Sequence, residues 1–388
     1  MRKNWDTLWQ EVQKMKKNRF KYTAISILIG LIVGAIILGV SGFNPFEAYW
    51  IMITGVFGSS KYISWTIIRS TSVIITGISV AFAFRTGLFN IGAEGQFIIG
   101  AMAATLVGYF WHLPPIVHVI VAFSAACIAA AIWGGIAGAI KSKFGINEVI
   151  TSIMLNWIAL YLNNYVIFWD KFKRPNSEAS YKILESAQSS ILTNWKLTEA
   201  GRTWISNHPL IGGFIDPPIN IGFIVAILLA FLINYILNNT TLGYQLRAVG
   251  FNKDASEYGG INVKRNIVVA MMISGAISGA AGALHVLGVS NEISVLAAME
   301  GNGFNGMAVS LIAGNNPIGC IFAGLLFGGL TYGGHKLQPI MGAPSEVINI
   351  MIGTIVFFIA MPKFVQMIVD RKGNFKIVKR GEKVESDK

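Results

Sequence analysis

The stretch Thr241-Leu-Gly-Tyr-Gln-Leu-Arg-Ala-Val-Gly-Phe-Asn-Lys-Asp-Ala-Ser-Glu-Tyr-Gly-Gly-Ile-Asn-Val-Lys-Arg265 is a polar segment between two long apolar runs. Asn252 is a good helix N-cap and Asp254 complements the positive end of a helix, so a short helix is predicted after Asn252. Gly259 and Gly260 are expected to end it. The Lys and Arg residues of segment 241–265 predict that this short helix lies outside the membrane, on its cytoplasmic side.

The composition identifies the class of protein. Of the 388 residues, 53% are hydrophobic and only 13% are charged, and the mean hydropathy is +0.57. No water-soluble domain of this length would show such values, so the chain is predicted to be an all-α polytopic membrane protein. The net charge of +12 does not imply a nucleic-acid partner, because the basic residues lie in the termini and loops, as membrane topology requires.

About ten apolar runs are long enough to be candidate transmembrane helices. They cover approximately residues 23–40, 63–84, 94–111, 115–140, 147–169, 219–238, 267–289, 302–314, 317–334 and 344–362. Seven Lys or Arg residues precede the first run, which predicts a cytoplasmic N-terminus. An even number of crossings returns the C-terminus to the same side.

These runs define the expected organisation of the chain. An amphipathic cytoplasmic segment, residues 1–22, is expected to lie on the lipid surface. A transmembrane domain covers residues 23–365, and a basic cytoplasmic tail covers 366–388. The extracytoplasmic loop 170–218 mixes six basic with five acidic residues and is expected to be a small folded or partly helical cap. It could bind an extracytoplasmic partner or be a passive cover.

Two polar, glycine-rich breaks interrupt the apolar pattern inside the membrane. The first is Arg85-Thr-Gly-Leu-Phe-Asn-Ile-Gly-Ala-Glu-Gly-Gln-Phe97, and the second is Glu300-Gly-Asn-Gly-Phe-Asn-Gly-Met307. Unwound backbone is tolerated in a bilayer only where it is buried in protein or lines a cavity. Because the breaks occupy corresponding positions, they predict two internally related halves with a substrate path at their interface.

Polar side chains in and near the breaks are candidates for this path. The amides of Asn90 and Asn305 can donate and accept, which suits a ribose or a purine edge, but both could instead cap broken helices. If the breaks face each other, both asparagines should line one cavity. Glu94 could stabilise a helix N-terminus or contact a neutral substrate. The complete candidate set is Asn90, Glu94, Gln96, Asn156, Asn302 and Asn305. For Asn156, a bond to a neighbouring helix is the simpler interpretation.

Other polar and small residues have structural interpretations. Arg69 is expected to snorkel to the outer interface, and Glu148 to cap the run that it begins. Gly275, Gly279 and Gly282 form a small-residue face suited to close helix packing. The cysteines and histidines show no metal-ligand spacing, so no metal site and no disulfide are predicted. These residues are Cys127, Cys320, His112, His118, His208, His285 and His335.

Three motifs carry a family resemblance. The spacing Ala248-x-Gly250-x-Asn252-x-x-Ala255-Ser256-x-x-x-Gly260-Ile261 resembles the cytoplasmic loop of permeases in bacterial ABC importers of the ribose, branched-chain amino acid and nucleoside type. Ser256 replaces the alanine that is usual there. The first break is similar to a Gly-Leu-Phe-Asn-Ile-Gly-x-Glu-Gly-Gln segment of the nucleoside branch. With the Gly-x-Gly-Phe-x-Gly-x-Ala run that ends at Ala308, the resemblance covers about residues 65 to 365.

The resemblance implies that the loop is a coupling helix, which sits in a cleft of the ATPase subunit. The residues carried over to that role are Arg247, Gly250, Asn252, Ala255, Ser256, Glu257, Gly260 and Ile261. The chain has no Gly-x-x-x-x-Gly-Lys-Ser/Thr motif, so ATP and Mg²⁺ would be used by a separate ATPase, and this chain would bind no cofactor and have no catalytic residue. The other implied partners are a solute-binding lipoprotein and a second, homologous permease, which we expect to be a different chain.

The expected function is therefore the permease subunit of an ATP-driven importer in a bacterial plasma membrane. A nucleoside is the first choice of substrate and a simple sugar such as ribose the second. An ion-coupled secondary transporter is the alternative from a different class. Such a protein should carry ion-coupling carboxylates deep in its spans, and only Glu94 and Glu300 qualify. No span carries a catalytic constellation, so a membrane enzyme is not supported.

Overall fold

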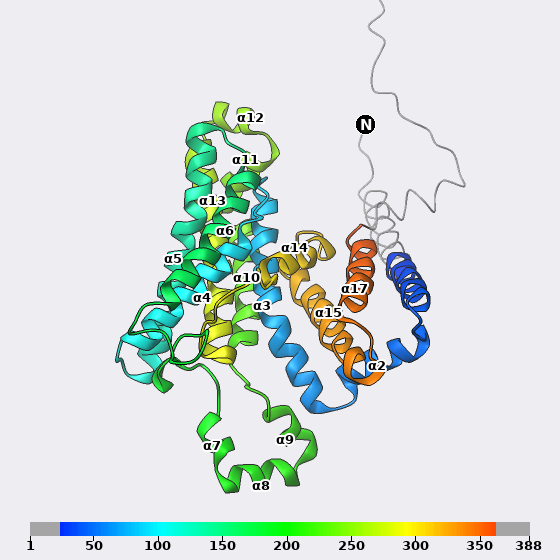
Figure 1. The fold of residues 1–388 in the computed structure, drawn as a ribbon. Coiled ribbons are helices and arrows are strands. Elements are labelled where there is room, and N and C mark those ends of the chain that lie inside the picture. Colours follow the sequence, from blue (N-terminus) through cyan, green and yellow to red (C-terminus); the bar gives the residue numbers. More distant parts are fainter. Residues whose placement is uncertain (1–23, 362–388) are drawn as a thin grey trace, which may run out of the picture.

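The computed structural model describes residues 24–361 (Figure 1). The predicted amphipathic segment 1–22 and basic tail 366–388 lie outside the described residues. Within 24–361 the chain forms helices and loops, with isolated β-bridges but no β-strand, which confirms the all-α class.

The helices begin with Ala24–Val40, after which the labels of Figure 1 apply. They are α2 Pro45–Phe57, α3 Ser60–Arg85, α4 Ala93–Phe110, α5 Pro115–Phe144, α6 Glu148–Ile167, η1 Glu185–Ala187, α7 Thr193–Leu197, α8 Glu199–Asn207, α9 Pro209–Ile215, α10 Gly222–Asn239, α11 Thr241–Phe251, α12 Lys253–Tyr258, α13 Val263–His285, η2 Val286–Ser290, α14 Asn302–Ile312, α15 Gly319–Gly334, α16 Leu337–Met341 and α17 Ser345–Ala360.

The number of full-length spans is smaller than predicted. Among the described residues, five helices are long and apolar enough to cross a membrane, namely α3, α5, α6, α10 and α13 extended by η2. Ala24–Val40 and α2 would add a sixth span if the pair, bent by 117°, is counted as one. Each predicted apolar run is helical, but α14 has 11 residues and α15 and α17 have 16 each. At 1.5 Å per residue they reach only about 16 to 24 Å, short of a hydrocarbon core of about 30 Å.

Helix α13 packs closely against α5 and α4 through its small residues. A Cβ atom added at Gly275 or Gly279 would overlap the backbone or Ala130 of α5, and one at Gly282 would overlap the carbonyl oxygen of Phe97 in α4. The predicted packing role of this small-residue face is therefore confirmed. Close backbone approach replaces side-chain interdigitation, as is common between helices in membranes.

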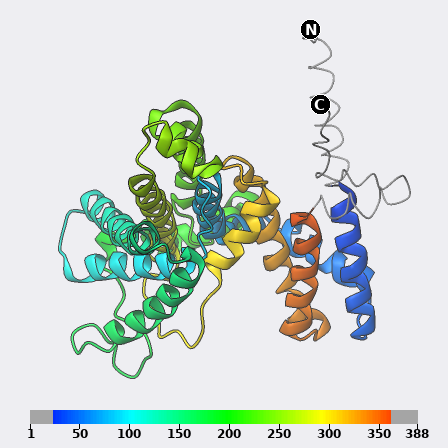
Figure 2. The same cartoon turned by 90° about the horizontal axis from the view of Figure 1, so that it is seen from above.

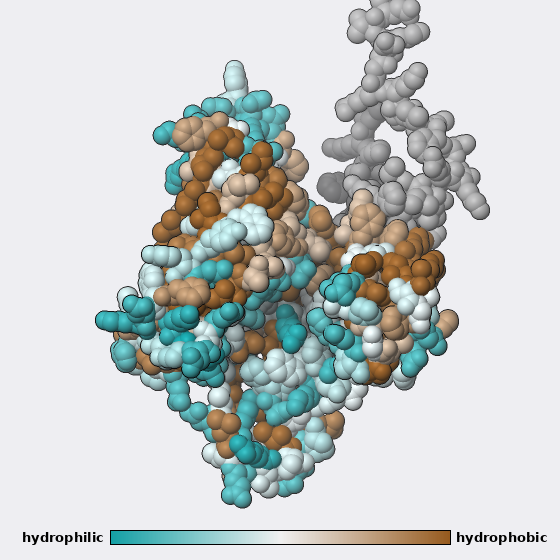
Figure 3. Space-filling model, viewed as in Figure 1, coloured by the Kyte–Doolittle hydropathy of each residue, from teal (hydrophilic) through white to brown (hydrophobic). Residues whose placement is uncertain are grey.

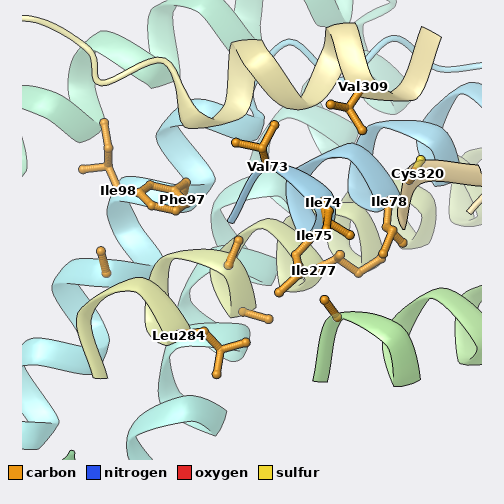
Figure 4. Packing of buried hydrophobic residues seen from close by; sticks show 14 of the residues in the cluster. Val73, Ile74, Ile75, Ile78, Phe97, Ile98, Ile277, Leu284, Val309 and Cys320 are labelled. Carbon is orange, nitrogen blue, oxygen red and sulfur yellow. The ribbon is translucent and has the colours of Figure 1, made fainter. Parts of the chain in front are cut away.

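Helix α3 lies between two groups of helices. On one side are α4, α5, α6, α10 and α13, and on the other are α14, α15, α17 and Ala24–Val40, with the last two side by side (Figures 1 and 2). Figure 4 shows Ile74, Ile75 and Ile78 of α3 packed near Ile277 of α13, with Val309 of α14 nearby. Consistent with this central place, 83% of the apolar window of α3 is buried, against 22% for α5. The exposed apolar residues contribute to the hydrophobic flank visible in Figure 3.

Two polar segments lie at opposite ends of the bundle. Helices α11 and α12 form the top of Figure 1, and α7, α8 and α9 form the bottom. The loop 170–218 is partly helical, as predicted, and is anchored by an ion pair of 2.9 Å between Arg174 Nη1 and Glu292 Oε2 and one of 2.7 Å between Lys61 and Asp216. The two segments predicted to face opposite sides of the membrane are thus far apart.

The short helix predicted between Asn252 and Gly259 is confirmed as α12. The Asn252 side-chain oxygen accepts a hydrogen bond of 3.0 Å from the Ala255 backbone N–H, so Asn252 is the N-cap. Gly259 follows the last helical residue, and Gly260 adopts a left-handed conformation with φ of 81°. A glycine avoids the steric strain that other residues would have there.

Candidate functional site

The first break is closed by a buried network of amides. After α3 ends, the chain turns at Gly87 (φ of 73°) and enters α4 at Ala93. The Asn90 amide nitrogen lies 2.8 Å from Gln96 Oε1 and 2.7 Å from Ser274 Oγ of α13, and Gln96 Nε2 returns a bond of 3.2 Å to Asn90 Oδ1. Asn90 is 0% exposed. Its amide therefore fixes the break against the bundle.

Asn156 reinforces the same break from α6. Its Oδ1 accepts a hydrogen bond of 2.8 Å from the Gly95 N–H, and its Nδ2 donates one of 3.0 Å to the Ile91 carbonyl. Both Asn156 groups thus satisfy backbone that the broken helix leaves unpaired. This is an interhelical bond of the kind expected for a single polar residue in a span.

Glu94 joins the two breaks. One carboxylate oxygen accepts a hydrogen bond of 2.8 Å from the Gly301 N–H, and the other accepts one of 2.5 Å from the Gly303 N–H. Glu94 is 0% exposed, and a Cβ at Gly303 would overlap the backbone of Glu94. The carboxylate therefore caps α14, where it also complements the positive end of the helix dipole. It binds the N-terminus of the other broken helix and not that of its own.

A cavity of about 900 Å³ lies beside the second break. Its walls come from α3, the α13–η2 region, α14, α15 and α17. Among the predicted path residues, Asn302 and Asn305 line it, whereas Asn90, Glu94, Gln96 and Asn156 do not. Asn90, which we expected to share a cavity with Asn305, is instead enclosed between α4 and α13. The volume lies within the range of about 300 to 1,000 Å³ that is usual for small-molecule sites.

Several cavity residues were not predicted from the sequence. Polar and aromatic side chains join the two asparagines in the lining, namely Trp65, Arg69, Ser72, His285, Glu300, Phe327, Thr331, His335 and Asn349. Arg69, for which snorkelling was predicted, lines the cavity together with His285 and His335, for which structural roles were predicted. A charged residue inside an apolar run was the available signal for Arg69. For His285, the π-helix η2 that follows it could not be read from the sequence.

The polar groups of the cavity are only partly paired with protein. The Arg69 guanidinium lies 5.8 Å from the Trp65 ring and 5.7 Å from the Tyr332 ring, and it forms no hydrogen bond or ion pair with another described residue. Glu300 Oε2 accepts a hydrogen bond of 3.0 Å from the Asn302 amide. The Asn305 side chain has no hydrogen-bond partner among residues 24–361. These groups remain available to a ligand.

The predicted coupling residues form the polar tip and its base. In α12, Ser256 is buried, and its hydroxyl donates a hydrogen bond of 2.7 Å to the Asn252 carbonyl. Ala255 and Glu257 are exposed, as is Gly260 beyond the end of the helix. In α11, Arg247 Nε donates a hydrogen bond of 3.4 Å to the Gly243 carbonyl. Ile261, which follows Gly260, is half-buried. Two exposed aromatic residues that the motif did not indicate flank α12: Phe251 is 91% and Tyr258 is 99% exposed.

Segment 241–265 contacts the first break directly. A Cβ at Gly250 of α11 would lie 2.7 Å from the Thr86 carbonyl carbon and 2.8 Å from the Gly87 nitrogen, so the two backbones touch. Glu148 supports the same turn, because it pairs with Lys141 of α5 and accepts a hydrogen bond of 3.4 Å from the Phe89 N–H. Glu148 lies in the first turn of α6, as expected for a residue at the helix start, but it is not the N-cap. The N-cap of α6 is Asn147, whose side-chain oxygen accepts a hydrogen bond of 2.9 Å from the Val149 N–H.

No metal-binding group accompanies the cavity. Among the described residues, no set of three His, Cys, Asp or Glu side chains is arranged to hold a metal ion. His118 is fully buried and bonds to Ser186 Oγ at 2.8 Å and to the Val107 carbonyl at 3.1 Å, which is a structural role. The cavity chemistry therefore consists of amides, hydroxyls, rings, one guanidinium and one carboxylate with two imidazoles.

Comparisons with known proteins agree on one family. The model of the family described as "Branched-chain amino acid transport system / permease component" matches residues 62–360. The guanosine ABC transporter permease protein NupP of Bacillus subtilis is 39% identical over 347 residues, 89% of this chain and 94% of the relative. The nucleoside ABC transporter permease protein NupB of Lactococcus lactis is 33% identical over 370 residues, 92% and 96% of the two chains. The glucose ABC transporter permease protein TsgB13 of Haloferax volcanii is 27% identical over 355 residues, 90% of each chain.

Proposed function

Because the chain belongs to this family of membrane permease components, we propose that it forms the translocation path of an ATP-driven importer for a nucleoside. The observation that carries the proposal is the cavity beside α14. Its lining offers the rings of Trp65 and Phe327 together with the amides of Asn302 and Asn305. A nucleoside has a flat base that stacks on aromatic rings and a ribose whose hydroxyls both donate and accept. The names of the two most similar relatives reported above support the same substrate class.

The proposed topology has about ten membrane segments in two related halves. Helices α4 and α14 are then broken helices that each begin at a glycine-rich turn, and Glu94 holds the two beginnings together. Both termini and segment 241–265 face the cytoplasm, while loop 170–218 faces outward. Support comes from the distribution of Lys and Arg along the chain and from the separation of the two polar segments (Figure 1).

The proposed coupling mechanism starts at α12, which docks into a cleft of a separate ATPase subunit. That subunit uses ATP and Mg²⁺, and this chain binds no cofactor. Phe251 and Tyr258 are almost fully exposed, and exposed aromatic residues of this kind are often buried by a partner protein. Movement of α12 reaches the first break through the contact of Gly250 with Gly87. The break then moves α14 through Glu94.

Two further protein partners belong to the proposal. A second, homologous permease would cover part of the apolar flank, where lipids cover the rest. Helices α5 and α10 leave most of their surface outside the bundle, with 22% and 28% of their apolar windows buried. A solute-binding lipoprotein would deliver the nucleoside to the side of loop 170–218. Delivery by such a protein allows the permease itself to bind weakly and release its ligand.

The experiment that tests the proposal measures ATP-dependent uptake of labelled guanosine into proteoliposomes that contain the assembled transporter. Ala255→Trp is the matched variant, because Ala255 is exposed on α12 and a bulky ring there should block docking without disturbing the fold. We expect the wild type to import guanosine and the variant to lose uptake at unchanged protein content. Uptake that follows an ion gradient without ATP would instead establish a secondary transporter.

A simple sugar is the second candidate substrate. The similarity to a glucose permease favours it, and the hydroxyls of a sugar would bind to the same amides of the cavity. Competition separates the two candidates in the same proteoliposomes. Displacement of labelled guanosine uptake by unlabelled inosine but not by excess ribose or glucose supports a nucleoside path, and the reverse order supports a sugar path.

A further inference from the structure

In the described part of the chain, the cavity is lined by one guanidinium and one carboxylate of opposite charge. Arg69 comes from α3, and Glu300 comes from the loop that precedes α14. No ion pair joins them among residues 24–361. One Glu300 oxygen accepts the Asn302 amide, and its other oxygen has no hydrogen-bond partner in the described part of the chain. The cavity thus presents unpaired donors at one point and an unpaired acceptor at another.

Such an arrangement calls for a neutral ligand that carries both acceptors and donors. A charge that faces a membrane cavity without a partner is costly, and its usual meaning is a functional contact. A single anion would satisfy Arg69 but would be repelled by Glu300, and a cation would meet the opposite conflict. A flat base with acceptors along one edge and donors along the next can satisfy both side chains.

We propose that Arg69 and Glu300 select 6-oxopurine nucleosides over 6-aminopurine nucleosides, a proposal that rests on the nucleoside function above. The O6 and N7 atoms of guanine accept the two donors of a guanidinium, and its N1–H and N2–H groups donate to a carboxylate. Adenine presents the N6 amino group, a donor, where guanine presents O6, and its N1 is an acceptor. Arg69 would therefore face a donor, and Glu300 would face an acceptor.

The aromatic neighbour of Arg69 suits the same ligand. Trp65 is half-buried, lines the cavity, and lies 5.8 Å from the guanidinium. Its ring provides a surface for stacking of a base. The interaction with Trp65 and Tyr332 also restrains the Arg69 side chain without using its hydrogen-bond donors. These donors stay directed by packing and free for the base edge.

The experiment compares guanosine with adenosine uptake in proteoliposomes of the assembled transporter. The variants are Arg69→Gln, Arg69→Lys and Glu300→Gln, and Lys143→Gln at the exposed end of α5 is the control. The readout is the ratio of guanosine to adenosine uptake, relative to the same ratio for the wild type. Because one delivery protein serves every variant, its own preference cancels in this comparison.

We expect Arg69→Gln to lower the ratio about tenfold or more, because glutamine binds the N6 and N7 atoms of adenine as arginine binds guanine. Arg69→Lys keeps the charge and should lower it less. Glu300→Gln should reduce guanosine uptake more than inosine uptake, since inosine lacks the N2 amino group. An equal loss of guanosine and adenosine uptake in Arg69→Gln would overturn the proposal and leave the nucleoside function standing. Absence of nucleoside uptake by the wild type would overturn both.

Discussion

The two glycine-rich breaks have similar sequences but different surroundings. In the first, Asn90 and Gln96 are buried and bond to each other, and Asn90 also bonds to Ser274. In the second, Asn302 and Asn305 face a cavity, and the Asn305 amide has no partner among the described residues. Helix α13 fills the space behind the first break, whereas open volume lies beside the second. The same motif is therefore enclosed in a hydrogen-bond network at the first break and lines a cavity at the second.

The largest effect is expected from a substitution that removes the hydrogen bonds between Glu94 of the first break and the backbone of the second break. Glu94→Leu removes the acceptor of the Gly301 and Gly303 N–H groups. The buried Gly303 donor is then unpaired at a cost of about 1 to 3 kcal/mol, and the half-buried Gly301 donor adds less. Thermal unfolding of the purified protein in detergent should show a strong loss of stability, with loss of uptake. Glu300→Leu is the matched control, since it removes a carboxylate that is exposed to the cavity.

The control should keep the melting temperature near the wild-type value while it lowers uptake. Glu94→Gln retains one acceptor oxygen and should lie between Glu94→Leu and the wild type. If Glu94→Leu unfolds at the wild-type temperature, the carboxylate does not hold α14 in place.

The next prediction compares the same substitution, asparagine to leucine, at one position in each of the two breaks. Asn90→Leu leaves the Gln96 amide without its buried partner, while Ser274 keeps its bonds to Ser79. The loss should destabilise the protein by about 1 to 3 kcal/mol. Asn305→Leu breaks no bond within the described protein and should leave stability unchanged while it lowers guanosine uptake about two- to tenfold, the effect of one amide contact. Membrane abundance and uptake, measured side by side, distinguish these outcomes. A pair of variants with the same phenotype would contradict the division of roles.

The sequence predicted the helices better than it predicted the cavity. The all-α class, the cap at Asn252 and the packing of Gly275 follow from local composition and spacing, so they could be predicted. Which break opens to a cavity depends on what packs behind it, and both breaks contain the same residue types. The apolar run alone places Arg69 near the outer membrane interface, and it does not indicate that this side chain lines a cavity. The short lengths of α14, α15 and α17 likewise depend on turns whose positions hydropathy does not define.

A third prediction concerns the contact between the first break and segment 241–265. Gly250→Ala places a Cβ within 2.7 Å of the Thr86 backbone, which must shift at a cost of about 1 to 3 kcal/mol. We expect fewer guanosine molecules to be imported per ATP hydrolysed. Gly259→Ala is the control, because its Cβ would lie 3.4 Å from the nearest atom and φ is −76°. An unchanged transport-to-hydrolysis ratio in Gly250→Ala would remove this contact from the coupling route.

The smallest expected effect concerns the hydrogen bond between Thr76 of α3 and the start of α14. Thr76 Oγ1 lies 2.9 Å from the Asn302 carbonyl, and 3.0 Å and 3.2 Å from the Ser72 and Val73 carbonyls of its own helix, so one proton is shared among three acceptors. Thr76→Val keeps the shape but removes this donor, and since the bond to Asn302 is only partial, the loss should fall near the lower end of about 0.5 to 1.5 kcal/mol. Asn302 should then be held less firmly, and the apparent KM for guanosine should rise up to about threefold at unchanged kcat. Thr105→Val is the matched control, because Thr105 Oγ1 bonds only within α4, at 2.7 Å from the Ala101 carbonyl. Equal KM values for the two variants would show that Glu94 and close glycine packing, without the Thr76 hydrogen bond, hold α14 in position.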